Sequence, residues 1–393
     1  MAPLMMRVAP YAVLRKLLPL PGQDLDWALC CEAIEALRVL DTTPQDPVHH
    51  AEGDVGTHTR WVIACLREDA TFQQALLDRQ WVMFMAALLH DIAKPATTVV
   101  DEATGRIRQP GHSQRGAVDA RVLLWLSGCP WELREAICRL IAVHQQPFFV
   151  WHSHRGTPPE YVVRKLSWEL RWSELLAVAR ADMRGRVCQD QASHLEDLLL
   201  LEELVREEGA WDRPRHFADV HTALQYFRGT RLYPDEPLHP QPGSRVTVMC
   251  GLPASGKNHW VGTHRPDLPV VSFDDAREAL GLAHGDNEGK VAHQVWDQAR
   301  ALLRAQAPFV WNATHLSHSM RDKTLDLLYA YHAQVDIVHL EQPLPELLRR
   351  NQRRDTTLTN AALLRMLHRW EAPLPTEAHH VVYGGGVALP TGG

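Results

Sequence analysis

Residues 251–258 read GLPASGKN, and this short string constrains the fold of its half of the chain more than any other feature. It satisfies the pattern G-x-x-x-x-G-K, follows the β-rich run RVTVMC, and precedes the helical segment NHWVGTH. Glycines at these positions let backbone N–H groups surround phosphate oxygens, the lysine reaches the β- and γ-phosphates, and the helix N-terminus adds positive charge. The residues predicted to bind ATP are therefore Gly251, Leu252, Pro253, Ala254, Ser255, Gly256, Lys257 and Asn258.

Lys257 is also predicted to act in catalysis. Lysine is rare in this chain, so few lysines would stand at a motif position by chance. The sequence has 23 histidines but only six lysines, and two of the six stand at motif positions. The phosphate-loop motif normally ends in Ser or Thr, whose hydroxyl binds Mg²⁺, whereas this chain has Asn258. An amide oxygen is a neutral ligand, so we expect Mg²⁺ to be held more weakly or through water.

The pattern of helices and strands divides the chain. Short β-rich runs, LPVVSF, FVWNAT and VDIVHL, alternate with helical segments after residue 245 and predict a parallel sheet covered by helices. From about 56 to 208 the apolar spacing is helical, over 58–68, 71–93, 114–127, 131–145, 159–183 and 193–208. Five prolines mark the stretch between these parts. We predict an all-α domain over 1–210, a Pro-rich linker over 211–244 and an α/β P-loop domain over 245–393.

Composition excludes several classes of protein. No window is long and apolar enough to span a membrane, and the N-terminus, with Arg15 and Lys16 inside its apolar stretch, is a poor signal peptide. The seven cysteines are odd in number and form no CxxC pair, which favours a reducing cytoplasm over a disulfide framework. A net charge of −6 gives no global sign of nucleic-acid binding, so such a partner would need local basic patches.

Charged residues after the phosphate loop suggest an acceptor side. Asp274 stands at a strand end and Arg277 three residues later, so one could accept a hydroxyl proton while the other holds a phosphate. The alternative is an ordinary helix N-cap with a surface arginine. Arg350 and Arg354, one helical turn apart, can stabilise the charge of a transferring phosphoryl group, or can form a solvated basic face.

Together these motifs resemble the kinase domain of the bacteriophage-type 5′-hydroxyl polynucleotide kinases. The P-loop, DDAR, WNATH at 311–315 and RRNQRRD follow the family's order over about 245–371. The resemblance implies that Asp274 is the general base, that Arg277 contacts the acceptor's phosphate, and that Arg350 and Arg354 are lid arginines. Asn312 stands where many relatives carry Asp, which removes a carboxylate near the metal.

In the helical half, histidines and aspartates have the spacing of a metal centre. His90 and Asp91 are adjacent at the end of an apolar helix, so both can face one ion. The full candidate ligand set is His58, His90, Asp91, His112, His144 and Asp182. Asp91 could bridge two ions, and mixed imidazole and carboxylate ligands suit Mn, Fe, Co, Ni or Zn. Two such ions support phosphoester hydrolysis, although any single histidine among 23 could instead be an ordinary surface or core residue.

The order of these residues resembles the HD phosphohydrolase superfamily, especially the HD domain of bacterial tRNA nucleotidyltransferases, over about 44–190. The resemblance implies that the six residues are metal ligands, that Lys94 is a catalytic phosphate contact, and that His50 and Arg184 bind substrate. The predicted fold class is therefore an HD-type helical domain followed by a P-loop kinase.

The two resemblances together are similar to the bacterial HD-Pnk end-healing family. That similarity implies ATP-dependent phosphorylation of 5′-OH RNA or single-stranded polynucleotide ends, and metal-dependent removal of 2′,3′-cyclic, 2′- or 3′-phosphates, leaving ends for a nucleic-acid ligase. One alternative is a nucleoside or sugar kinase fused to a nucleotide phosphohydrolase. Another is an ATP-switched binding protein with a degenerate HD site.

Overall fold

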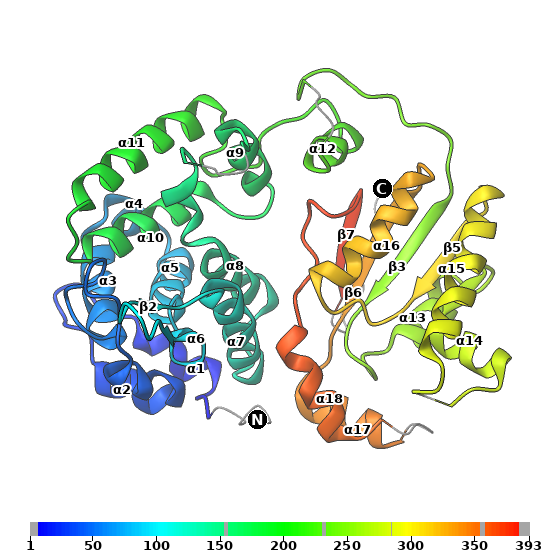
Figure 1. Cartoon of the computed structure of the whole chain (residues 1–393), viewed down its shortest axis with the longest axis horizontal. Helices are drawn as coiled ribbons and strands as arrows, with labels where there is room; N and C mark the ends of the chain where they lie inside the picture. Colours follow the sequence, from blue (N-terminus) through cyan, green and yellow to red (C-terminus); the bar gives the residue numbers. More distant parts are fainter. Residues whose placement is uncertain (1–6, 153–155, 230–232, 284, 354–357, 385–393) are drawn as a thin grey trace. The chain divides into compact units, whose positions relative to one another are not determined.

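The computed structural model describes residues 7–152, 156–229, 233–283, 285–353 and 358–384. The chain divides into two compact units, residues 1–215 and 216–393 (Figure 1). The first is helical and the second contains a parallel sheet, so the predicted two-domain fold class is confirmed.

The N-terminal unit is built from helices that surround one hydrophobic core. Its α-helices are α1 (Tyr11–Leu14), α2 (Trp27–Ala33), α3 (Val55–Glu68), α4 (Ala70–Gln74), α5 (Leu77–Leu89), α6 (Lys94–Thr97), α7 (His112–Leu126), α8 (Trp131–Val143), α9 (Pro159–Ser167), α10 (Trp172–Arg184) and α11 (Gln191–Glu207). Three 3₁₀ helices, η1 (Arg15–Leu17), η2 (Glu35–Thr42) and η3 (Gln146–Phe149), and a small hairpin of β1 (Val99–Val100) and β2 (Ile107–Arg108) complete it.

Two helices, α5 and α10, run through this core. Every residue from Trp81 to Leu89 in α5 is buried, and so is every residue from Trp172 to Met183 in α10. A helix that is apolar on all sides packs inside a domain rather than on its surface. Asp182 lies near the end of α10, and His90 and Asp91 directly follow α5, so the core helices carry polar side chains to one interior point.

Two predicted helices are each divided in the structure. The stretch 71–93 forms α4 and α5, broken at Ala75, where the Gln80 side chain donates to the freed carbonyls of Phe72 and Gln73. The stretch 159–183 forms α9 and α10. Neither break contains Gly or Pro, so the sequence has no helix-breaking residue that would have predicted these two boundaries.

The C-terminal unit is a parallel sheet flanked by helices. Its strands are β3 (Arg245–Cys250), β4 (Val270–Ser272), β5 (Phe309–Asn312), β6 (Gln334–Leu340) and β7 (His380–Gly384), in the order β4-β5-β3-β6-β7. Its helices are α12 (Val220–Phe227), α13 (Lys257–His264), α14 (Phe273–Leu280), α15 (Glu288–Arg304), α16 (His318–Ala330), α17 (Leu344–Arg353), α18 (Asn360–Arg365) and the 3₁₀ helix η4 (Met366–Arg369). All pairings are parallel.

Both faces of the sheet are covered. Val246 and Val248 of β3 pack in one cluster with α15 and α16, whereas Met249 packs in a second cluster with Val261 of α13. Successive strand residues point to opposite faces, so this division is that of a doubly wound sheet. In such sheets ligands bind beyond the carboxyl ends of the strands, which is where β3, β4 and β5 deliver the predicted kinase residues.

The stretch 211–244 differs from the predicted Pro-rich linker, because it contains α12. Asp219 caps this helix, and Leu224, Tyr226 and Phe227 are buried. The unit boundary falls between residues 215 and 216, ahead of α12. Val220, Ala223, Leu224 and Phe227 have the i, i+3, i+4, i+7 spacing of an amphipathic helix, a signal that the surrounding prolines mask.

Candidate metal and phosphoryl-transfer sites

The six predicted ligands of the N-terminal unit converge from separate helices into one buried cluster. They are His58 of α3, His90 and Asp91 after α5, His112 at the start of α7, His144 after α8, and Asp182 of α10. Each is at most 5% exposed. Their donor atoms form two groups, each within 4.8 Å, namely His58, His90 and Asp182, and Asp91, His112 and His144.

Close contacts connect the two groups. His58 Nε2 lies 3.1 Å from Asp182 Oδ1 and 3.4 Å from His90 Nε2. His90 Nε2 is 3.1 Å from Asp91 Oδ2, and His112 Nε2 is 3.3 Å from Asp91 Oδ1. Each oxygen of Asp91 therefore faces a different group, which is the arrangement expected of a bridging carboxylate.

Backbone carbonyls fix the imidazole rings. His90 Nδ1 contacts Ala87 O at 2.8 Å, His112 Nδ1 contacts Gln109 O at 2.7 Å, and His144 Nδ1 contacts Ile141 O at 2.7 Å. A carbonyl only accepts, so Nδ1 carries the proton and Nε2 presents a lone pair. Burial lowers the pKa of His144 to about 3 and also lowers that of His112, which keeps both rings neutral near pH 7.

The cluster contains buried polar atoms that fit divalent ions. Within the described part of the chain, both oxygens of Asp91 and Nε2 of His112 lack a hydrogen bond. Burial by itself raises the pKa of Asp91, but the close contacts with His90 and the Lys94 ammonium outweigh it and hold the pKa well below its usual value. Buried polar atoms left without partners are costly, and the imidazole and carboxylate donors are those of transition-metal sites.

Lys94 and His50 lie beside the six ligand candidates. Lys94 Nζ is 2.7 Å from Asp91 Oδ2 and 2.6 Å from Gln45 Oε1, and its side chain is buried. The ring of His50 packs edge-on against His58 at 4.9 Å between centroids. Both therefore lie against the cluster, with His50 beside the group that contains Asp182.

Arg184 does not reach the cluster. It is exposed on α10, whereas Arg186 binds Asp182, with Nε 3.0 Å from Oδ1 and Nη2 2.5 Å from Oδ2. Arg186 lies two residues beyond the end of α10, and the segment after the helix brings it to Asp182. The prediction therefore named the wrong arginine: Arg186, not Arg184, contacts the cluster.

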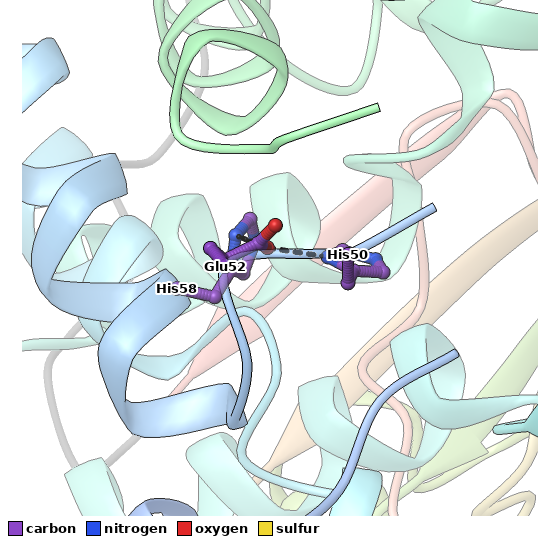
Figure 2. A group of neighbouring side chains, drawn as sticks. All are labelled: His50, Glu52 and His58. Carbon is purple, nitrogen blue, oxygen red and sulfur yellow. Dashed lines mark hydrogen bonds and ion pairs between the residues drawn. The ribbon is translucent and has the colours of Figure 1, made fainter. Parts of the chain in front are cut away.

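Glu52 is a residue that the sequence prediction missed. Its Oε1 lies 2.7 Å from His50 Nδ1 and 2.9 Å from His58 Nδ1 (Figure 2). Its Oε2 accepts from Val187 N. The side chain is fully buried. Burial raises its pKa, but the hydrogen bonds from both histidines outweigh that effect and hold the pKa of Glu52 well below its usual value. Glu52 therefore orients His58 with Nε2 toward Asp182.

The phosphate loop of the C-terminal unit has a backbone geometry that requires glycine at two positions. Gly251 has φ +140°, and a Cβ there would lie 2.2 Å from Leu340 O, while Gly256 has φ +105°. Lys257 begins α13, and its Nζ donates to the carbonyls of Gly251 and Leu252 at 2.9 and 2.8 Å. The loop thus wraps around the lysine at the carboxyl end of β3.

The two departures from the kinase motif contact each other. Asn312 Nδ2 donates to Asn258 Oδ1 at 2.8 Å, across 54 residues of sequence. Asn312 ends β5 in register with Met249 of β3, so parallel pairing brings it beside the P-loop. The pair offers neutral amide groups in place of a hydroxyl and a carboxylate, which makes it a weaker match for Mg²⁺ than the usual donors.

Asp274 and Arg277 share the first turns of α14 and form an ion pair with each other. Ser272, not an aspartate, caps the helix. Arg277 Nη1 is 3.0 Å from Asp274 Oδ1 and its Nη2 is 2.8 Å from Glu288 Oε2. The Asp274 side chain is 80% exposed and that of Arg277 only 14%, so an acceptor phosphate would have to displace a carboxylate to reach Arg277.

Arg350 lies near the phosphate loop. A Cβ added at Gly256 would be 3.5 Å from Arg350 Nη1, and the guanidinium also pairs with Glu346 through Nε at 2.5 Å. Arg354 lies outside the described residues.

Comparison with known proteins relates parts of the chain to other proteins. Residues 246–373 match the AAA domain family. Over 113 residues the chain is 40% identical to the multifunctional CCA protein of Halorhodospira halophila. The aligned stretch covers 29% of this chain and 23% of that protein. The match thus spans less than a quarter of the relative's length.

Two solved kinase structures are also similar. A sugar kinase from a Janibacter species has 22% identity and a TM-score of 0.26, covering 36% of this chain and 85% of its own. A gluconokinase from Sinorhizobium meliloti has 20% identity and a TM-score of 0.26, covering 39% and 86%. At these scores we infer no function from either.

The C-terminal unit is a P-loop domain of the kinase-like class. Its fold and phosphate loop imply ATP and Mg²⁺ and support phosphotransferase activity. Among the described helices, none combines the length and apolar character needed to cross a membrane.

Proposed function

We propose that this chain is a bifunctional end-healing enzyme, with a metal-dependent phosphohydrolase in the N-terminal unit and a polynucleotide 5′-hydroxyl kinase in the C-terminal unit. The observation that carries the first activity is the convergence of six ligand-type residues around the buried carboxylate of Asp91. The 113-residue stretch that is 40% identical to a multifunctional CCA protein supports a relationship between part of this chain and part of that protein.

In the hydrolase, His58, His90, Asp91, His112, His144 and Asp182 would hold one or two divalent ions. Ions in such a set supply a nucleophile at neutral pH and stabilise phosphoryl oxygens. The chain's own cations complete the site: Lys94 and Arg186 reach the carboxylates of Asp91 and Asp182 and provide positive charge for a phosphate. His50, beside His58, lies at the same centre and can hydrogen-bond a phosphoryl oxygen.

In the kinase, the 5′ oxygen of the acceptor attacks the γ-phosphorus of ATP, the bond from that phosphorus to the β,γ-bridging oxygen breaks, and ADP leaves. Asp274 accepts the proton of the 5′ hydroxyl. Its carboxylate is held by Arg277, which Glu288 holds in turn. Lys257 and the loop amides bind the transferred and β-phosphates, with Arg350 near the same loop.

The open position of Asp274 favours a polynucleotide over a small acceptor. Its side chain is 80% exposed, so a long chain can reach it, whereas a kinase for a free sugar usually encloses its acceptor.

The test uses purified protein with ATP, Mg²⁺ or a transition metal, and RNA bearing 5′-OH and 2′,3′-cyclic phosphate ends. We expect the wild type to convert both ends. Asp91→Ala should abolish the hydrolase and spare the kinase, while Asp274→Ala should slow phosphoryl transfer about 10²- to 10⁴-fold and spare the hydrolase.

Two results would contradict the proposal. Phosphorylation of a free nucleoside but not of RNA would identify a small-molecule kinase. ATP binding with no transfer to either acceptor would identify an ATP-switched binding protein.

A further inference from the structure

A pocket of about 490 Å³ in the N-terminal unit is lined by residues that neighbour two ligand candidates in the sequence, His112 and His144. Its lining includes Ser113, Gln114, Gln145, Gln146 and Phe149. Among the described residues that line it, none carries a charge. Its volume is within the range of small-ligand sites, but its lining offers no cation to hold a phosphate, so its occupant is a neutral group.

Two residues that line the pocket are sequence neighbours of ligand candidates. Ser113 follows His112 at the start of α7, and Gln145 follows His144 after α8. Ser113 Oγ donates to Gln145 Oε1 at 3.1 Å, which joins the two helix ends into one wall. Because neighbouring Cα atoms are about 3.8 Å apart, this wall begins within the length of one nucleotide from the ligand group.

Phe149 gives the pocket an aromatic surface. Its side chain belongs to a residue that is 60% exposed, although its neighbours Phe148 and Val150 are each only 4% exposed. The two buried neighbours anchor the backbone here and leave the Phe149 ring at the surface. A large exposed ring beside a polar pocket is a stacking surface for a planar group.

Carboxamides supply hydrogen bonds suited to the edge of such a group. Gln114 Nε2 donates to Ala142 O at 3.2 Å and leaves its Oε1 as an acceptor. Gln145 uses Oε1 toward Ser113 and leaves Nε2 as a donor. A neutral, flat ligand with both donors and acceptors at its edge, attached to a phosphate, is a nucleobase within a nucleotide.

We propose that this pocket binds the nucleobase of the nucleotide whose terminal phosphate is hydrolysed at the metal centre, with Phe149 stacking on the base. The proposal rests on the hydrolase activity proposed above and adds to it the site that holds the base of the terminal nucleotide.

The test compares 3′-AMP with glycerol phosphate, a phosphomonoester without a ring, on wild type, Phe149→Ala and Leu77→Ala. Leu77 is a matched control, because it is also exposed, at 62%, but lies at the opposite end of α5 from His90. Phe149→Ala should lower kcat/KM for 3′-AMP about 5- to 100-fold, through KM, as expected for loss of one base–aromatic stack. Turnover of glycerol phosphate should not change, and Leu77→Ala should match the wild type on both.

A binding measurement separates failure of the pocket from failure of the hydrolase. Cytidine, which lacks the adenine that the ATP site of the kinase unit would hold, is titrated calorimetrically into metal-stripped wild type and Phe149→Ala, and only the wild type should bind it, since stacking tolerates any base. If Phe149→Ala changes both substrates equally or neither, or binds cytidine as the wild type does, the pocket assignment is wrong. If the wild type hydrolyses neither ester but still binds cytidine through Phe149, the proposed hydrolase fails and the base pocket stands.

Discussion

Replacing Glu52 by alanine should weaken metal binding without unfolding the N-terminal unit. Glu52 contacts no predicted ion, but it holds His58 through Oε1 at 2.9 Å. Partners that orient a metal-binding histidine typically contribute 10- to 100-fold in metal affinity. Gly185 O, 3.2 Å from the same Nδ1 atom, remains as an acceptor in the variant. We therefore expect the lower end of this range, about a tenfold rise in the dissociation constant.

The measurement is a titration of metal-stripped protein with Co²⁺ in competition with a chelating dye, together with the visible spectrum of the loaded protein. Because the spectrum reports the ligands and their geometry, a displaced His58 changes it, whereas a distant structural effect does not. Glu52→Gln, which keeps an acceptor oxygen, should recover most of the affinity. Glu68→Ala is the matched control, since Glu68 is an exposed glutamate on the same helix as His58.

One outcome would refute this reasoning. If Glu52→Ala melts at nearly the wild-type temperature and binds Co²⁺ with wild-type affinity and spectrum, His58 does not depend on Glu52 for its orientation. The same result would leave Glu52 with only the contacts to His50 and Val187 N.

Three further predictions concern the C-terminal unit. Asn312→Asp should lower the Mg²⁺ concentration for half-maximal ATP turnover about tenfold, because a carboxylate replaces an amide beside Asn258; an unchanged requirement would show that the pair does not face the metal. Arg321→Met should destabilise the unit by about 3–5 kcal/mol in urea unfolding, since it removes the buried guanidinium that pairs with the carboxylate of Glu377, and Glu377→Gln in the same chain should restore part of the loss. Burial lowers the pKa of His379 from 6.5 to about 4. Between these pH values the unfolded chain binds a proton that the folded chain does not, so the stability of the unit should fall as the pH is lowered from 6.5 to about 4. His379→Phe should flatten this part of a profile of melting temperature against pH.

Much of the candidate metal centre could be predicted because its residues occupy recognisable places on helices. His90 and Asp91 follow an apolar helix, and such adjacency survives any small error in helix boundaries. Arg186 could not be chosen over Arg184 in the same way, because Arg186 lies beyond the end of α10 and reaches Asp182 from the segment that follows the helix. Glu52 gave no periodic signal at all, since it lies in an irregular segment and acts through contacts with α3 and the loop after α10.

The contact between Asn258 and Asn312 illustrates a different limit. Each residue was visible as a departure from a motif, and each alone indicated a weaker metal site. Only the parallel pairing of β3 with β5 places them together, so their hydrogen bond is a property of strand order rather than of local sequence. Two departures that satisfy each other describe an altered site with its own geometry, whereas two isolated losses would describe a decayed one.

The same structural device positions the chemistry in both units. In the helical unit, buried α5 and α10 carry His90, Asp91 and Asp182 to their ends, and in the α/β unit the carboxyl ends of parallel strands carry the phosphate loop and Asn312. Side chains on rigid elements keep the precision that ions and phosphates require. The segments between these elements, such as the irregular stretch with Glu52 and the 3₁₀ helix η3 with Phe149, then determine which ligands are oriented and which substrates fit. Substitutions in these segments should therefore change selectivity and affinity before they change the fold.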